Sequence, residues 1–133
     1  MTVPGCPPQR RARQRSSLAF RYDLGAGLTL LALGVAGFLL PAASRAVGLS
    51  PRGLRSAVHL ASGLALTLAA STGAAQLAAQ ISGIVYTAAA VLGFVDRTTV
   101  LHLFPVNDAC NVVHLAIGVL GQWAGFRRET RDP

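Results

Sequence analysis

Two histidines stand in uncharged, apolar stretches of this sequence, where an imidazole could bind a proton or a ligand. His59 lies in "AVHLASGLALTLA", and His114 lies in "NVVHLAIGVLGQW", which begins with Asn111. An imidazole titrates near neutral pH, donates and accepts hydrogen bonds, and ligates metals or haem iron. An ionisable group inside a membrane helix is costly unless it faces other helices, so each histidine raises a functional hypothesis.

Three interpretations of His59, Asn111 and His114 remain open. As structural residues, they would form hydrogen bonds between helices. As a ligand-binding site, they would hold a small ligand or a proton. Two histidines at equal depth could instead ligate haem, and no other cofactor is expected.

The sequence contains no familiar catalytic motif. It has no lysine and therefore no P-loop, and it has neither HExxH nor CxxC nor two carboxylates within one apolar stretch. We therefore predict no catalytic residue, no metal site and no enzymatic activity.

The two histidine stretches match each other at an offset of 55 in the numbering, and two further stretches, "GLTLLALGVAGF" and "GIVYTAAAVLGF", match at an offset of 56. Near-equal offsets in two separate pairs indicate a tandem duplication. Each copy would be one helical hairpin, and an axis along the membrane normal would relate the copies. The first pair matches at Val58, His59, Leu60, Ala61 and Gly63, and the second at Gly27, Val35, Gly37 and Phe38.

The composition indicates a membrane protein. Hydrophobic residues make up 52% of the chain and charged residues 13%. Residues 24–44, 56–95 and 109–126 contain no charged side chain. Since a crossing needs roughly 20 apolar residues, we predict an all-α integral membrane fold with four transmembrane helices in two tandem hairpins.

Caps and turns predict the helix boundaries. The first helix should run from Leu24 to Leu40, and the second from Ser50-Pro51 to Ala70. A turn at Ser71–Gly73 should precede a third helix over 80–95, and the last helix should follow Pro105, capped by Asn107 or Asp108, and end at Phe126. The domains would be a disordered basic arm (1–17), the membrane domain (18–127) and a cytoplasmic tail (128–133).

Glycines recur on single helical faces. In the last helix Asn107, Asn111, His114, Gly118, Gly121 and Gly125 follow one another by three or four residues. Small residues let membrane helices approach closely, so these faces should pack on other helices. Tyr22 and Trp123, near helix ends, are expected in aromatic belts. The predicted packing residues are Gly27, Gly34, Gly37, Gly63, Gly118, Gly121 and Gly125.

Arginine supplies all twelve basic residues, and these flank the apolar stretches. Four crossings place eight arginines on the side of the termini and four opposite, which predicts cytoplasmic termini in the plasma membrane. This arrangement fits membrane orientation better than nucleic-acid binding, so no nucleic acid is expected. The expected partners are the lipid bilayer and a second copy or another membrane protein.

Three stretches resemble a known family. They are "YDLGAGLTLLALGVAGF", "SAVHLASGLALTLAA" and the entry to the last helix, with Asn107, Asp108, Asn111, His114, Leu115 and Gly118. Over Arg21 to Gly125 the chain resembles the bacterial membrane proteins called domain of unknown function 4383. The resemblance implies a four-helix membrane fold and no assigned activity, and the first loop here is shorter and bears arginine.

The leading functional expectation is a structural or interaction role in the bacterial plasma membrane. The alternative is a small-ligand or proton-coupled, transport-like binding protein that uses His59 and His114. A haem-binding subunit with these two histidines as ligands is the third.

Overall fold

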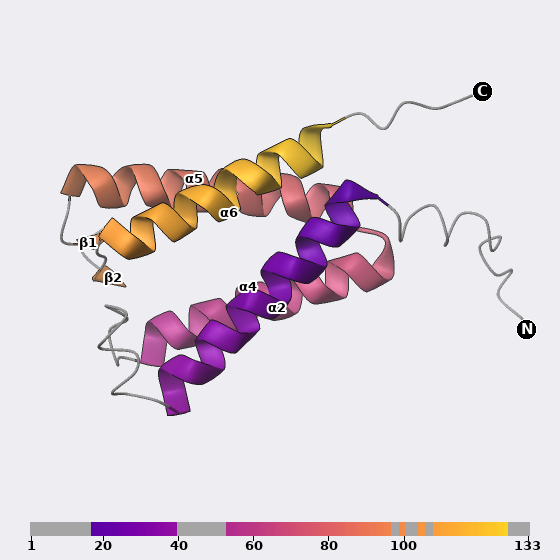
Figure 1. The fold of residues 1–133 in the computed structure, drawn as a ribbon. Helices are drawn as coiled ribbons and strands as arrows, with labels where there is room; N and C mark the ends of the chain where they lie inside the picture. The colour runs from indigo at the N-terminus through magenta and orange to yellow at the C-terminus, as the bar shows by residue number, and fades with distance from the viewer. Residues whose placement is uncertain (1–16, 40–52, 97–98, 101–103, 106–107, 128–133) are drawn as a thin grey trace, which may run out of the picture.

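The described part of the chain folds into four helices. The computed structural model describes residues 17–39, 53–96, 99–100, 104–105 and 108–127. A short antiparallel ladder of β1 (Thr99–Val100) and β2 (Phe104–Pro105) lies in the connection between the third and fourth helices, and the sequence did not predict it. The helices are α2 (Leu18–Leu39), α4 (Gly53–Thr72), α5 (Ala75–Asp96) and α6 (Asp108–Phe126), as Figure 1 shows.

The helices pack as two antiparallel hairpins. α2 packs mainly on α4, and α5 mainly on α6. α4 and α5 are consecutive in the chain but make few contacts with each other. Figure 1 shows that α2 and α5 run in the same direction and that α4 and α6 return in the opposite one.

The predicted helices are present, but two of them begin earlier than expected. α2 begins at Leu18 rather than Leu24, and the hydroxyl of Ser17 caps it by accepting a 3.1 Å hydrogen bond from the Phe20 N–H. α5 begins at Ala75 rather than at residue 80. Gly73 adopts a φ of 95°, which forms the predicted turn after α4. The two early starts show that polar residues were wrongly assigned to loops.

The other predicted boundaries agree closely where they can be compared. α4 ends at Thr72, shortly after the predicted Ala70, α5 ends at Asp96 and α6 ends at Phe126. The predicted caps Ser50, Pro51 and Asn107 lie outside the described residues, as do 1–16 of the arm and the tail.

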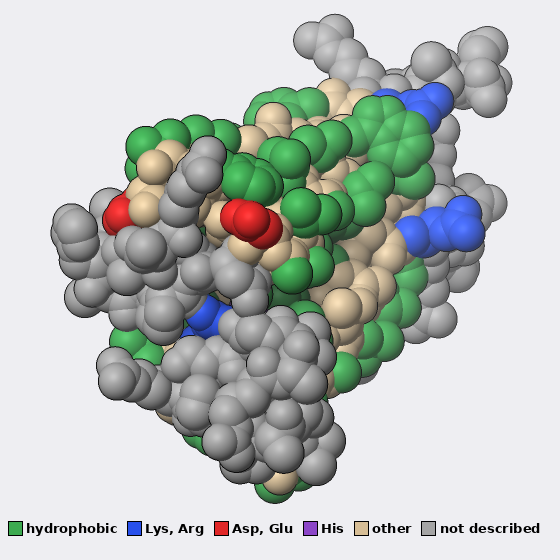
Figure 2. Space-filling view, turned by 60° about the vertical axis from the view of Figure 1, so that its left-hand side comes forward, with side chains coloured by type: hydrophobic (Ala, Val, Ile, Leu, Met, Phe, Trp, Pro, Cys, Tyr) green, Lys and Arg blue, Asp and Glu red, His purple; other side chains and the backbone are tan. Residues whose placement is uncertain are grey.

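Three of the four described helices are long and apolar enough to cross a membrane: α2, α5 and α6. α4 does not reach the same apolarity because Arg55, Ser56 and His59 occupy its first two turns. The expected fourth crossing is therefore not established by length and composition. Among the described residues in Figure 2, hydrophobic side chains are spread over the surface and the charged ones lie toward the two ends of the bundle, as expected for a surface in contact with lipid.

The two hairpins bury equivalent positions. Every buried residue of α2 has a buried counterpart in α5 at the offset of 56. In α4 and α6, buried positions recur at the offset of 55. The α2 and α5 pairs are Ala19 and Ala75, Asp23 and Ala79, Gly27 and Gly83, Leu30 and Tyr86, Gly34 and Ala90, and Gly37 and Gly93.

The two hairpins also have equivalent contacts between their helices. Gly37 faces Ser56 of α4, and Gly93 faces Asn111 of α6. Gly37 and Gly93 are 56 residues apart, and Ser56 and Asn111 are 55 residues apart. The contacting residues therefore have the same offsets as the two sequence matches. Gly27 facing Thr67 and Gly83 facing Gln122 form a second matched pair of contacts.

Candidate functional site

His59 and His114 lie side by side between the two hairpins. Their ring centroids are 6.3 Å apart, and the rings are inclined at 75°. Each histidine is the seventh residue of its helix, about 9 Å from the helix start at 1.5 Å per residue. The structure thus brings together two of the three predicted ligand-binding residues from α4 and α6.

A pocket of about 80 Å³ adjoins both imidazoles. A water molecule occupies about 30 Å³ of liquid, so the pocket has room for roughly two or three waters or one small molecule. Its walls are almost entirely apolar apart from the two rings. The lining residues come from α2, α4 and α6: Leu30, Leu33, His59, Ala109, Cys110, Val113, His114 and Ile117.

The ring of His114 also contacts Tyr86 of α5, with 5.4 Å between the centroids. Its Nδ1 atom is buried and has no hydrogen-bond partner. An unpaired buried polar atom costs about 1–3 kcal/mol, so it calls for an explanation. No pattern in the sequence pointed to Tyr86 as a neighbour of His114.

A positive charge lies next to the pocket. Arg55 donates a hydrogen bond from Nη1 to Sγ of Cys110, at 3.6 Å, and Cys110 lines the pocket with its buried thiol. Among the described lining residues none is acidic. The pocket therefore has apolar walls and two imidazoles, and a guanidinium group lies behind its Cys110.

Asn111 is not part of this pocket. Its side chain is fully buried between α6 and α5, where it faces Gly93, and neither amide atom has a hydrogen-bond partner. The structure therefore separates Asn111 from the two histidines with which the sequence analysis grouped it.

Glutamines and Tyr22 form the hydrogen bonds that the sequence analysis considered for the histidines and Asn111. The Gln122 amide donates to Thr87 Oγ1 at 2.8 Å, and the Gln80 amide donates to the Gly125 carbonyl at 2.8 Å. Tyr22 donates to the Ile117 carbonyl at 3.0 Å. Tyr22, which is expected in an aromatic belt, thus also forms a hydrogen bond between α2 and α6.

All seven predicted packing glycines are buried at helix contacts. A Cβ at Gly27 would lie 2.6 Å from Thr67 Oγ1, and one at Gly121 would lie 2.6 Å from the Tyr22 hydroxyl. Such distances leave no room for a side chain. The others, Gly34, Gly37, Gly63, Gly118 and Gly125, face Leu60, Ser56, Leu31, Thr87 and Gln80 in the same way.

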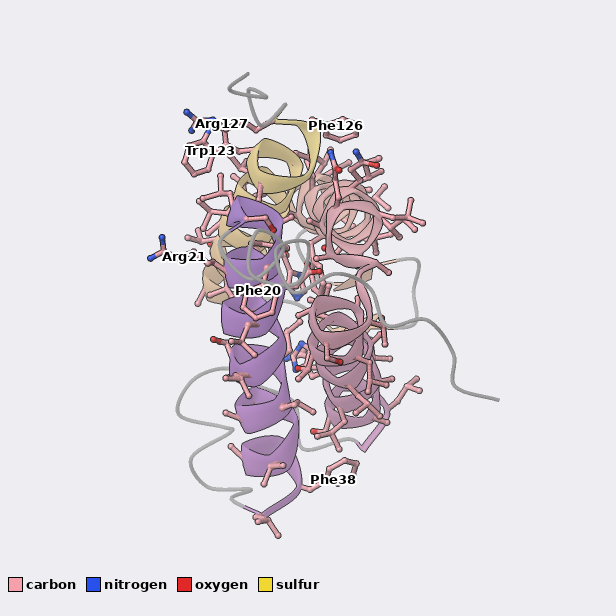
Figure 3. All side chains as sticks on the ribbon, turned by 90° about the vertical axis from the view of Figure 1, so that its right-hand side faces the viewer. Phe20, Arg21, Phe38, Trp123, Phe126 and Arg127 are labelled. Atoms are coloured by element: carbon pink, nitrogen blue, oxygen red, sulfur yellow. The ribbon has the colours of Figure 1, made fainter. Side chains whose placement is uncertain are left out.

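Aromatic and basic side chains mark the end of the bundle that holds the termini. The Arg127 guanidinium lies 5.2 Å from the centre of the exposed Trp123 ring. Figure 3 shows Arg127, Trp123 and Arg21 on one side near this end, and Phe38 at the opposite end. Trp123 is therefore placed as a belt residue would be.

Sequence reasoning missed one buried ionisable residue, Asp23. It is fully buried in α2, and neither carboxylate oxygen has a hydrogen-bond partner. The predicted helix began one residue later, so Asp23 fell outside it. The available signal for its burial was its position in "YDLGAG": Asp23 lies four residues before Gly27, on the same face of the helix.

The haem interpretation of the two histidines stays a prediction. The pocket of about 80 Å³ holds no haem without rearrangement of the surrounding helices. Within the described residues, no group of three His, Cys, Asp or Glu side chains is placed to hold a metal ion.

Comparison with known proteins identifies a family for the chain. No curated protein and no solved structure matches it. The model of the domain of unknown function (DUF4383) matches residues 21–127, which include all four described helices except the first three residues of α2, and the chain therefore belongs to this family.

Proposed function

We propose that this chain is a bacterial plasma-membrane protein whose four helices all cross the bilayer as two tandem hairpins. The matched burial and the matched glycine contacts of the hairpins support the duplication. α4 has 20 residues and spans about 30 Å, the thickness of the hydrocarbon core. Its one charged residue, Arg55, lies in the first turn, where the side chain can extend to the interface.

The termini lie in the cytoplasm in this proposal. Arg21 and Arg127 flank the end of the bundle where the described chain begins and ends, and six further arginines precede residue 17 or follow residue 127 in the sequence. Arginine-rich segments next to membrane helices are typically on the cytoplasmic side. The arrangement that follows is two parallel hairpins about an axis along the membrane normal.

The function that the geometry supports best is binding of a small ligand between the hairpins. The observation that carries this proposal is the unpartnered, buried Nδ1 of His114 beside His59 and a pocket. A purely structural histidine in a membrane interior would use its nitrogen in an interhelical hydrogen bond. Nδ1 is shielded from the pocket surface in this structure, so a ligand with one hydrogen-bonding group would reach it through a rotation of the imidazole ring.

The pocket selects ligands by size and polarity. An engineered dry cavity of about 150 Å³ binds benzene, so we expect this pocket of about 80 Å³ to favour molecules smaller than benzene. Leu30, Val113 and Ile117 would contact apolar atoms of the ligand, and His114 would contact its polar group. The preferred ligand is therefore a small neutral molecule with one hydrogen-bonding group.

A purely structural or interaction role, the leading expectation from sequence, has less support. The glycine faces that were expected to reach a partner are used within the chain, because they pack on neighbouring helices. Self-association through these glycines is therefore not part of this proposal. We retain the expectation that the protein is not an enzyme.

The experiment is a titration of the ¹⁵N-histidine-labelled protein in nanodiscs with 1-propanol. We expect the imidazole resonances of His59 and His114 to shift saturably. The Ala109→Leu variant fills the pocket and should abolish the shifts. The matched Ala116→Leu variant adds the same side chain at an exposed position of α6 and should behave as wild type. Unchanged shifts in Ala109→Leu, or none in wild type, would reject the binding proposal.

A further inference from the structure

Asp23 is a carboxylic acid buried inside the bundle without a partner. Its exposed fraction is 0%, and both carboxylate oxygens lack hydrogen bonds. It lies five residues after the start of α2, about 8 Å from the helix end at 1.5 Å per residue. This is the end of the bundle opposite the histidine pocket, as the antiparallel packing of α2 on α4 requires.

The described residues around Asp23 are uncharged. Gly27 of α2 faces Gly63 and Thr67 of α4, so one turn earlier Asp23 is level with the last turns of α4. The starts of α2 and α5 meet in a cluster of Ala19, Ala75 and Ala79. No Asp, Glu, Lys, Arg or His occurs from residue 60 to 95, which covers the facing parts of both helices.

The other described groups near this end of the bundle do not supply a counter-charge. The neighbouring hydroxyl of Tyr22 is engaged with the Ile117 carbonyl and with Ser82. Residues 115–126 of α6 contain no charged side chain, and Arg21 and Arg127 are exposed. An ionised Asp23 would therefore be a buried, uncompensated charge, which is strongly unfavourable.

A bound metal cation is not the explanation. Hard cations require several oxygen ligands, six or more for calcium and magnesium. Among the described residues, no cluster of acidic or other metal-ligating side chains includes Asp23. A proton is the cation that one isolated carboxylate can hold.

Packing does not require a carboxyl group at this position. The equivalent residue in the second hairpin, Ala79, is equally buried, with an exposed fraction of 0%. The first hairpin thus carries a carboxylic acid where the second carries a methyl group. The difference points to a role for Asp23 other than filling space.

We propose that Asp23 is a proton-binding site in the membrane. It carries its proton as a neutral carboxylic acid while α2 is packed on α4 and α5. On ionisation it releases H⁺ to water at the end of the bundle where α2 begins, leaving a carboxylate, and it takes a proton back from the same side. This proposal goes beyond ligand binding at the histidine pocket and does not depend on it.

Labelling with dicyclohexylcarbodiimide tests the protonated state. This apolar reagent reacts with a carboxylic acid in the membrane: the acid proton moves to a carbodiimide nitrogen, the carboxylate oxygen adds to the central carbon, and rearrangement leaves a stable N-acylurea. All atoms are retained, so the product gains the mass of one carbodiimide. Full-length protein in liposomes is labelled at neutral pH, digested and sequenced by mass spectrometry.

We expect the peptide containing residue 23 to be labelled in wild type and in the control Asp108→Asn, which changes an exposed carboxylate. Asp23→Asn should lose this label. Asp23→Ala, which copies the second hairpin's Ala79, should lose it too and remain folded. Absence of label at Asp23 in folded wild-type protein would overturn the proposal.

A pH series tests release of the proton. Labelling at Asp23 should fall at alkaline pH and return when the pH is lowered, with helicity unchanged by circular dichroism throughout. Labelling that stays constant across the range in which the protein remains helical would show a permanently trapped acid. That result would contradict a proton-exchanging site.

Discussion

The imidazoles of His59 and His114 meet with 6.3 Å between their centroids, although the two residues are far apart in the sequence. Each is the seventh residue of its helix. Residues related by a two-fold axis lie close together only near that axis. The histidine pair therefore marks the line where the two proposed hairpin copies meet, and the pocket beside it is the place where both copies contribute polar groups.

Two glycines of α2 give a matched test of helix packing. A Cβ at Gly27 would lie 2.6 Å from Thr67 Oγ1 and 3.0 Å from the Gly63 carbonyl, whereas a Cβ at Gly25 meets nothing within 4 Å. We expect Gly27→Ala to lower the free energy of unfolding by about 1–3 kcal/mol. Gly25→Ala should leave it unchanged or raise it by up to about 1 kcal/mol. Equal melting temperatures in detergent would contradict this assignment of the faces.

Gln122 should matter more for stability than His114. Its amide donates to Thr87 Oγ1 at 2.8 Å and to the Gly83 carbonyl at 3.3 Å. Gln122→Leu keeps most of the side-chain volume but loses both hydrogen bonds. It should therefore lower the free energy of unfolding by about 0.6–1.7 kcal/mol. His114→Leu removes an unpartnered nitrogen and should be nearly neutral. Chemical denaturation measures the free energy of unfolding of both variants. A larger loss of stability in His114→Leu than in Gln122→Leu would restore the structural interpretation of the histidine.

Gly93 and Asn111 should be energetically coupled. A Cβ at Gly93 would lie 2.7 Å from Asn111 Cγ, so Gly93→Ala should destabilise the protein by about 1–3 kcal/mol. Asn111→Ala makes room and removes an unpaired amide. The double variant should be more stable than Gly93→Ala alone, as a double-mutant cycle measures. Additive effects would mean that the two residues do not meet.

The sequence predicted the four helices, the turn at Gly73 and the burial of the glycine faces because charge segregation and three-to-four-residue spacing are local patterns. It misplaced the starts of α2 and α5, whose first turns contain the polar residues Arg21, Asp23 and Gln76. The contacts of Gln80 and Gln122 depend on how one helix is aligned along another. The repeat suggested that His59 and His114 lie at the same depth, but only the packing of the hairpins determines their separation and the exclusion of Asn111.

The proposed membrane crossing of α4 can be tested by mapping the topology. α4 is the helix in question because polar residues occupy its first turns. Reporter fusions at both termini and within Ser71–Gly73 should report the cytoplasm, and a fusion within 41–50 should report the opposite side. If α4 does not cross, the turn at 71–73 will instead report the same side as 41–50.

The most direct test of the meeting of the two hairpins is a nuclear Overhauser measurement between the two imidazole rings in histidine-labelled protein, with assignments from His59→Ala and His114→Ala. At 6.3 Å between centroids and 75° between planes, ring protons of the two histidines approach closely enough to give a cross-peak. We expect this cross-peak within one chain, including in samples diluted with unlabelled protein. Two assigned, ordered rings with no cross-peak would contradict the meeting of the hairpins at the histidine pocket.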